Sequence, residues 1–516
     1  MKKKFFVRIL IMGLFLLFPI ALTSCEFIPG EPSKVLPKED FEISPYFCDG
    51  MVLQQKEMVT IKGKTEASVT MKVSLYRNEF EYKSITNIAN DKGDFILSFE
   101  APKASKDVYR MEINDGVHKK VFKNVHFGDV YVVCGEGYLS SPTYEKDKDS
   151  FTISSYTAFY QNGEWITENK ENNVISEFVF RFARKLADKE NLPIGVVVAV
   201  ADSAHIDSWL SPKLIADNKR VNDFLTSEHR LLELSNGYYE DYDTMSSLFL
   251  QVLEIASGFN TKALIWNQGE TNFDNKKFTS EKDIAKYASE YQYVLLKLIE
   301  QFYEQFNNSN ILILQSASSD KTYMPYLRNL QAISSYYYNY VNLITTYDLN
   351  EMITKDVSTE SLEEKEIEEE SDKNDYILGD VSIDKVISRV VKVLHATIYK
   401  KINGYLPPSY INSIYDTKYI HLTFSNAANL ISQGNNAIVV KDIDGNIIDT
   451  NVYFDGNWIL IELPKDIIDE ETNEVIKAPI IKEISYGQDA DITYNIIVNE
   501  QGIPIVPFRI NVTNYQ

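Results

Sequence analysis

The stretch VYVVCGEGYLSSP, from Val130 to Pro142, begins as an uninterrupted apolar run and ends in a glycine-rich turn. A continuous apolar run of this length is typical of a strand buried on both faces, as strands are in parallel sheets. Gly135 and Gly137 bracket a single acid, Glu136. In many α/β hydrolases a strand of this kind breaks into a turn that carries the nucleophile, so a glycine at 137 is unexpected.

Strand-like and helix-like segments alternate around this stretch, over residues 127–403. The helical candidates are amphipathic, as in ISEFVFRFARKLADKEN and YASEYQYVLLKLIEQFYEQF. The predicted strands are Val130–Cys134, Gly195–Ala201, Ala263–Trp266, Ile311–Gln315 and Asn342–Tyr347. This alternation predicts an α/β fold class, with right-handed β-α-β units, a parallel sheet and helices on both faces of the sheet.

Short strands with turn signals lie on both sides of this region. Residues 41–126 contain segments such as SVTMKVSLY and GDFILSFEAP, which predict an N-terminal β-sandwich-like domain. Residues 404–516 contain YIHLTFS, AIVVKDIDG and VYFDGNWILIELP, which predict a second, C-terminal β domain.

The N-terminus has the pattern of a secretion signal. Four basic residues precede an apolar run over Ile9–Leu22, and that run is too short to span a bilayer comfortably. LTSC, ending at Cys25, resembles a bacterial lipobox, and a plain signal peptide with a chance cysteine is the alternative. We expect residues 1–24 to be a lipoprotein signal peptide and residues 25–40 a tether. A lipid on Cys25 would anchor the chain to a bacterial membrane on the extracytoplasmic side.

Charge and composition exclude several classes of partner. The net charge of -22 argues against nucleic acid. The acidic run Ser358–Asp375 has almost no apolar residues and predicts a disordered, solvated insertion, with calcium binding as an alternative whose ligand spacing is missing. The six histidines are scattered, so we expect no metal and no other cofactor. No oligomeric state is predicted.

Four motifs in order add a family resemblance. They are ISPYFCDGMVLQQ (43–55), FGDVYVVCGEGYL (127–139), LIWNQGETNF (264–273) and NEQGIPIVPFRI (499–510). Together they resemble the bacterial sialate O-acetylesterases, which are SGNH-type carbohydrate esterases, over about residues 41–516. The resemblance implies an SGNH-hydrolase-like, flavodoxin-like core flanked by β domains. It also implies a serine nucleophile, an oxyanion hole of glycine and asparagine, and a late histidine base.

The catalytic positions depart from the family pattern. Gly137 stands in the place of the nucleophilic serine, and a glycine has no group that can attack a carbonyl. Ser140 and Ser141 are the alternative nucleophiles, but we expect them about one turn into the following helix. Gly379 stands in the place of the histidine when the alignment is anchored on Arg389. His395 is expected to be packed or solvated.

The oxyanion block differs as well. Asp202-Ser203-Ala204 replaces Gly-Gly-Thr, and a carboxylate beside a forming oxyanion would oppose it. Asp202, Ser203 and His205 are too close in sequence for a triad, so we interpret them as loop residues. The third motif, LIWNQGETNF, is preserved. Asn272 in this motif either offers its amide to a carbonyl oxygen or belongs to a loop that Gln268 and Glu270 hold by backbone hydrogen bonds. The former oxyanion or pocket residues are Asp202, Ser203, Gly269 and Asn272. The pocket-lining candidates are Glu136, Tyr138, Gln268 and Glu270.

These substitutions predict a surface lipoprotein that has lost catalysis and binds acetylated glycans. Loss of the serine or the histidine from a triad lowers kcat by about 10⁶. Two alternatives remain open. One is an active carbohydrate O-acetylesterase that uses other residues, and the other is a structural or assembly lipoprotein that docks a partner through its β domains.

Overall fold

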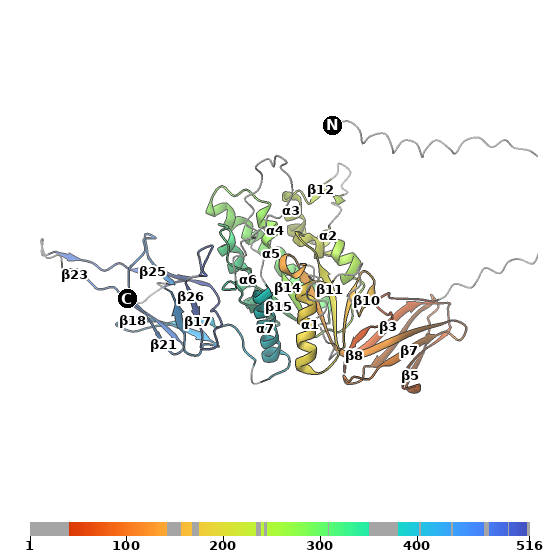
Figure 1. Cartoon of the computed structure of the whole chain (residues 1–516). Coiled ribbons are helices and arrows are strands. Elements are labelled where there is room, and N and C mark those ends of the chain that lie inside the picture. The colour runs from red at the N-terminus through yellow and green to blue at the C-terminus, as the bar shows by residue number, and fades with distance from the viewer. Residues whose placement is uncertain are drawn as a thin grey trace, which may run out of the picture. The chain divides into compact units, whose positions relative to one another are not determined.

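The computed structural model describes residues 41–141, 156–167, 175–233, 239–241, 245–307, 309–349, 380–401, 404–434, 437–468, 474–493 and 495–512. Residues from Phe41 to Gln516 form one compact unit (Figure 1). The predicted signal peptide with Cys25, the tether, the acidic insertion and Gly379 lie outside the described residues. None of the described helices is long and apolar enough to cross a membrane.

A largely parallel sheet forms the centre of the fold, which confirms the α/β prediction. In space its strands follow the order β10-β9-β11-β8-β14-β15-β16, and all neighbouring pairs are parallel except β10 with β9. The strands are β8 (Lys119–Gly135), β9 (Thr157–Gln161), β10 (Glu164–Ile166), β11 (Ile194–Val200), β14 (Ala263–Asn267), β15 (Asn310–Leu314) and β16 (Val341–Ile344).

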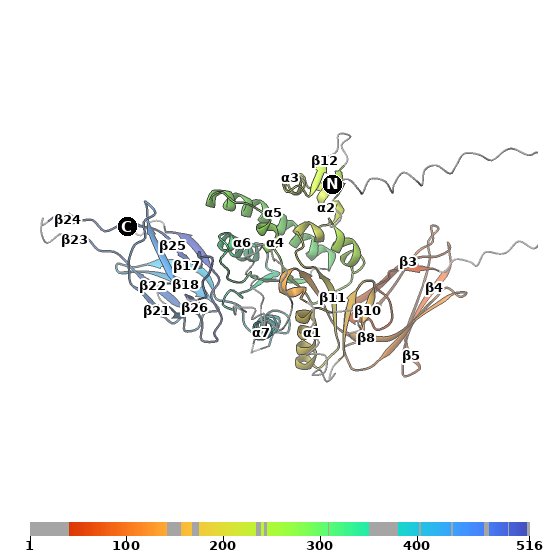
Figure 2. The ribbon, with the colours of Figure 1, turned by 45° about the horizontal axis from the view of Figure 1, so that its top comes forward.

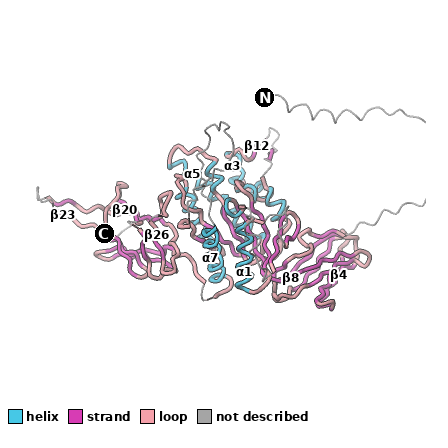
Figure 3. The backbone as a smooth tube through the Cα atoms, viewed as in Figure 1, coloured by secondary structure: helices cyan, strands magenta, loops and turns pink. Residues whose placement is uncertain are grey.

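Helices cover both faces of this sheet (Figure 3). Successive side chains of a strand point to opposite faces. Val132 and Cys134 of β8 accordingly pack in the core that includes α5 (Glu281–Gln305) and α6 (Met324–Tyr337). Tyr131 and Val133 pack instead in the core that includes α1 (Glu177–Glu190) and α7 (Asp380–Thr397). Figures 1 and 2 both show α1 and α7 side by side.

Local capping fixes where the long helices begin. The Ser176 side chain accepts a hydrogen bond from Val179 N at the start of α1, and Ser280 does the same for Asp283 N at the start of α5. Such caps satisfy backbone donors that have no partner inside the helix. The shorter helical segments are η1 (Gly137–Leu139), η3 (Ile206–Trp209), α2 (Pro212–Asp217), α3 (Lys219–Ser227), the π-helix η4 (Phe249–Leu253) and α4 (Glu270–Asp274).

The N-terminal strands form two sheets, and β8 belongs to one of them as well as to the central sheet. One sheet contains β1 (Glu42–Ile43), β3 (Met58–Lys64) and β6 (Asp94–Glu100). In the other sheet, β5 (Phe80–Ile88) pairs with β4 (Thr70–Arg77), β4 pairs with β7 (Tyr109–Asn114), and β7 pairs with β8. The strand β2 (Val52–Gln54) pairs in parallel with the middle of β8. The predicted boundary at 126/127 therefore lies inside a continuous strand.

The C-terminal strands have a core of their own. They form a four-stranded sheet, a three-stranded sheet and short two-stranded pairs. The four-stranded sheet contains β17 (Ser409–Tyr415), β18 (Tyr419–Ser425), β21 (Val452–Asp455) and β22 (Trp458–Glu462), and the three-stranded sheet contains β20 (Ile438–Asp442), β25 (Ile481–Tyr486) and β27 (Phe508–Asn511). The pairs are β19 (Ile431–Gln433) with β26 (Ile496–Val498) and β23 (Ile467–Ile468) with β24 (Val475–Ile476). A further two-stranded pair, β12 (Leu231–Glu233) with β13 (Tyr239–Asp241), belongs to the central region.

Two of the four motifs meet at a buried carboxylate. Asp129 Oδ1 accepts hydrogen bonds from Gln54 Nε2 and Gln55 Nε2, each at 3.0 Å, and its Oδ2 accepts one from the Tyr399 hydroxyl at 2.7 Å. Gln54 Oε1 in turn accepts from Val130 N at 2.8 Å. MVLQQ and GDV are thus structural motifs, which hold β2 and the segment after α7 against β8.

The last motif is a turn that holds the C-terminal strands to the central sheet. Asn499 Oδ1 accepts from Gln501 N at 3.1 Å and from Ile503 N at 3.0 Å. The carbonyl of Ile505, just beyond this turn, accepts from the Tyr347 hydroxyl, which lies beyond the end of β16. This motif therefore also has a structural role.

Candidate functional site

The glycine-rich turn lies where the order of the parallel strands reverses. The strand β11 lies on one side of β8. The strand β14, which follows β11 in the chain, lies on the other side of β8. Ligands of open α/β sheets bind at such a switch point, beyond the carboxyl ends of the strands. Glu136 N donates to Asn267 O at 2.9 Å, which ties the turn to the end of β14. A Cβ at Gly135 would come within 2.0 Å of Asn267 O, so this position needs glycine.

Gly137 occupies the exposed point of the turn. Its φ is +63°, in the left-handed region that favours glycine, and a Cβ built there meets nothing within 4 Å. The turn therefore keeps the space for a projecting side chain but carries none. Ser140 Oγ donates to Gly137 O at 2.8 Å, so this alternative nucleophile is bonded to the backbone of the turn.

Glu136 connects the turn to the start of α4. Its Oε1 accepts from Gly269 N at 2.9 Å and from Thr271 N at 3.2 Å, whereas Oε2 has no hydrogen-bond partner among the described residues. The side chain is 3% exposed, and this burial raises the pKa of the carboxyl to about 7. Glu136 therefore titrates near neutral pH while it holds the two loops together.

Gln268 and Asn272 form one buried network. Gln268 Nε2 donates to Asn272 Oδ1 at 2.7 Å and to Ala204 O at 3.1 Å, and its Oε1 accepts from the Tyr291 hydroxyl. Asn272 Oδ1 also accepts from Ile206 N at 2.9 Å. Gln268 thus connects the loop after β14 to Ala204 and to Tyr291 of α5. The Asn272 side chain also hydrogen-bonds to Tyr287, an interaction that opposes the rise in the pKa of the Tyr287 phenol caused by burial.

Gly269 and Glu270 complete this loop. Gly269 has a φ of +139°, and a Cβ there would come within 2.5 Å of Leu327 Cδ1, so glycine is required. Burial raises the pKa of Glu270, and interactions with Ser316, Arg328 and Lys321 partly offset this effect. Tyr138 lies nearby, because the charge of Glu270 contributes to the raised pKa of its phenol. The Tyr138 hydroxyl is buried without a partner among the described residues.

Asp202 and Ser203 lie in an exposed turn after β11. Neither side chain makes a hydrogen bond to another described residue, and His205 Nε2 pairs with Asn275 Nδ2 at 3.0 Å. No triad-like contact therefore joins Asp202, Ser203 and His205 in the described structure. Ser203 has a φ of +53°, a conformation typical of glycine, so the loop keeps a glycine-like backbone with a serine in place.

The late part of the chain brings no histidine to the turn within the described residues. Arg389 forms two hydrogen bonds of 2.6 Å with Asp348 and one of 2.7 Å with Thr345 O. His395 Nε2 pairs with Glu190 Oε1 at 2.9 Å, where α1 ends just before β11 begins. That contact is at the amino edge of the sheet, opposite to the turn. His395 is packed, as expected.

Sequence reasoning missed the part that Glu136 plays in joining the two loops. The turn and the loop after β14 are 133 residues apart, so no local pattern reports the contact of Glu136 with Gly269. The only available signal was a buried acid between two glycines. Tyr291, which bonds Gln268 from α5, had no signal beyond the apolar face of its helix.

Replacement of Glu136 by Gln should change the pH dependence of stability. The folded pKa of about 7 lies above the ordinary 4.5, so the folded chain binds more protons between these values and loses stability as pH rises through 7. A shift of this size corresponds to roughly 3 kcal/mol. Urea unfolding gives the free energy of unfolding of Glu136→Gln and of the native chain. The value for the variant minus that for the native chain should therefore be more positive at pH 8 than at pH 5. An equal difference at both pH values would contradict the raised pKa.

Solved structures place this fold among known proteins. A carbohydrate acetylesterase from Xanthomonas citri matches 92% of this chain and 100% of its own length, with a TM-score of 0.67 and 16% identity. At this identity the likeness shows the fold alone. The chain therefore has the fold of a carbohydrate acetylesterase, with a mixed α/β core and additional β-rich C-terminal sheets. A scan of protein-family models and a search of curated proteins give no match.

Two further solved structures match this chain over a smaller share of its length. The acetyl xylan esterase Est2A from Butyrivibrio proteoclasticus covers 70% of this chain and all of its own length, at 12% identity and a TM-score of 0.28. A family two carbohydrate esterase from Clostridium thermocellum covers 67% of this chain and 94% of its own, at 10% identity and a TM-score of 0.29. Superpositions this loose add nothing to the assignment of the fold.

Proposed function

We propose that this protein is a catalytically inactive relative of the sialate O-acetylesterases that binds acetylated glycans. In this proposal it is held on the outside of a bacterial cell by a lipid on Cys25. The observation that carries it is the bare turn at Gly137, which has open space but no attacking group. The parallel order β9-β11-β8-β14-β15-β16, with β8 between β11 and β14, is compatible with descent from an SGNH-type scaffold.

The nucleophiles nearest to the turn are poorly suited to replace a serine. Cys134 is fully buried, and burial raises the pKa of its thiol well above the ordinary value, which disfavours the reactive thiolate. The Ser140 hydroxyl donates a hydrogen bond to a backbone carbonyl, and no described histidine bonds to it or to Ser203. Without a paired base a serine hydroxyl is a weak nucleophile.

Features that a ligand could use remain beside the turn. The Asn272 side chain is held by Gln268 and Tyr287, and the buried Tyr138 hydroxyl and Glu136 Oε2 lack partners among the described residues. Polar groups that are held in place by a buried network lose little freedom when a ligand arrives. This arrangement favours retention of binding after loss of chemistry.

The test separates binding from turnover. The purified full-length chain should release no p-nitrophenol from p-nitrophenyl acetate above the rate of a Glu136→Ala/Asn272→Ala double variant. Titration with O-acetyl sialic acid or acetylated xylo-oligosaccharides should still raise its melting temperature. Turnover that the double variant abolishes, or no thermal shift with any of these sugars, would overturn the proposed function.

A further inference from the structure

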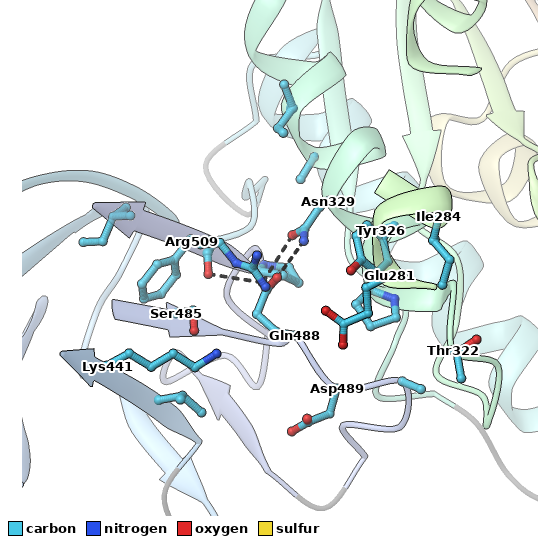
Figure 4. A pocket seen from close by; sticks show the side chains of 18 of the residues that line it. Glu281, Ile284, Thr322, Tyr326, Asn329, Lys441, Ser485, Gln488, Asp489 and Arg509 are labelled. Carbon is cyan, nitrogen blue, oxygen red and sulfur yellow. Dashed lines mark hydrogen bonds between the residues drawn. The ribbon is translucent and has the colours of Figure 1, made fainter. Parts of the chain in front are cut away.

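A cavity lies apart from the turn, between the helices of the central domain and the C-terminal sheets. It has a volume of about 1000 Å³ and is lined by residues of α5 and α6 on one side and of β20, β25 and β27 on the other (Figure 4). No residue of the turn around Gly137 lines it. We call this cavity the junction groove. Its volume is at the upper end for ligand sites, which is enough for an extended ligand.

The floor of the junction groove is fixed by hydrogen bonds. Asn329 Nδ2 donates to Gln488 Oε1 at 2.8 Å, and Gln488 Nε2 donates to Tyr486 O at 3.0 Å. Arg328, fully buried on α6, donates to Ala490 O at 2.9 Å and to the carbonyl of Asp489. Burial lowers the pKa of Arg328 to about 10, so the guanidinium stays charged at neutral pH. The groove is therefore formed before any ligand binds.

Aromatic and aliphatic side chains line the walls. Tyr336 on α6 is 58% exposed, and Ile333, one turn earlier, is 46% exposed. Tyr410 on β17 also lines the groove and is stacked on Phe508, with the ring centres 5.6 Å apart. Rings of this kind offer flat apolar faces at a low cost in conformational entropy. Such faces suit the flat C–H faces of sugar rings.

The charges around the junction groove balance. Lys441 and Arg509 come from the C-terminal sheets, whereas Glu281 comes from the start of α5 and Asp489 from the loop after β25 (Figure 4). The Lys441, Glu281 and Asp489 side chains make no hydrogen bond or ion pair within the described part of the chain. Any strongly charged ligand would meet a like charge on one wall. A neutral ligand rich in hydroxyl groups can use both the donors and the acceptors.

We propose that the junction groove binds a neutral oligosaccharide, which stacks on Tyr336 and Tyr410 and hydrogen-bonds to Lys441, Glu281 and Asp489. The proposal rests on the proposed function, because it takes a glycan as the ligand, and it moves the binding site away from the turn. The exposed Ile333 and Ile447 side chains would contact the methyls of acetyl groups on that chain.

Calorimetric titration of the full-length chain with acetylated xylohexaose, xylohexaose and sialic acid tests the site. The two neutral sugars should bind, the acetylated one more tightly, and sialic acid should bind more weakly than either. Tyr336→Ala should weaken binding by about tenfold, a typical loss for an anchoring aromatic residue. Tyr337→Ala is the matched control, because Tyr337 is the next residue of α6, is 61% exposed and does not line the groove.

Each contrary result has a distinct meaning. Equal affinities of Tyr336→Ala and Tyr337→Ala would overturn the junction groove as the site. Loss of binding in Glu136→Ala/Asn272→Ala with full binding in Tyr336→Ala would place the ligand at the turn, which leaves the proposed function intact. Tighter binding of sialic acid than of xylohexaose, or no binding of either neutral sugar, would overturn the neutral-ligand assignment. Ester hydrolysis by the native chain would instead overturn the proposed function.

Discussion

Replacement of Asp129 by Leu should lower the free energy of unfolding by about 4 kcal/mol, since hydrogen bonds to a charged group contribute about 1.5–3 kcal/mol each and are not additive. Asp129 is 1% exposed and accepts from Gln54, Gln55 and Tyr399. A leucine of similar size fills the space but removes the shared acceptor, which leaves the Gln54 amide with only a long contact to Gln55 O and the Tyr399 hydroxyl with only Tyr131. Urea denaturation followed by tryptophan fluorescence measures the loss.

Asp129→Asn is the control for this variant. The asparagine oxygen can still accept from the two glutamine amides, and its NH₂ group can donate to the Tyr399 hydroxyl, so we expect less than half of the leucine effect. If both variants were equally unstable, the negative charge itself, rather than the three hydrogen bonds, would be what stabilises the fold at this point.

Replacement of Asp348 by Ala should also cost about 4 kcal/mol, because loss of one partner from a buried ion pair leaves an uncompensated charge. The Asp348 and Arg389 side chains are 12% and 9% exposed and share two hydrogen bonds of 2.6 Å. In Asp348→Ala the Arg389 guanidinium would keep only the carbonyl of Thr345. Urea unfolding measures the difference.

The double variant Asp348→Leu/Arg389→Met tests the cause. Apolar replacement of a whole buried pair is often neutral or stabilising, so this variant should recover most of the stability that Asp348→Ala loses. If the double variant were less stable than Asp348→Ala, the ion pair itself would make a net contribution to stability, beyond avoiding an unpaired buried charge.

The central fold could be predicted because its signals are local. Each parallel strand is a short apolar run, and each long helix has an apolar stripe, as α5 shows with Tyr291, Leu295 and Leu298 buried on one side. These patterns need no knowledge of distant residues. The predicted boundary at 126/127 falls where β8 changes partners, between the pairing of Val125 with β7 and that of Asp129 with β11, but local patterns did not show that β8 runs unbroken from Lys119 to Gly135.

The candidate site was predictable only in part. Gly137 could be singled out from the strand and glycines before it, and the resemblance indicated what it replaces. The hydrogen bonds of Glu136 could not be predicted, because they connect loops that only the sheet brings together. The junction groove had no sequence signal at all, since Tyr336 and Lys441 lie on different domains and are 105 residues apart in the numbering.

The continuity of β8 has a consequence for how this chain can be divided. A shortened protein that began at residue 127 would sever the strand after His126 and lose the β2 partner that pairs with His126, Phe127 and Gly128. It would also remove both glutamines that hold Asp129. The N-terminal sheets are therefore no detachable module, and the two regions should melt together as one cooperative body.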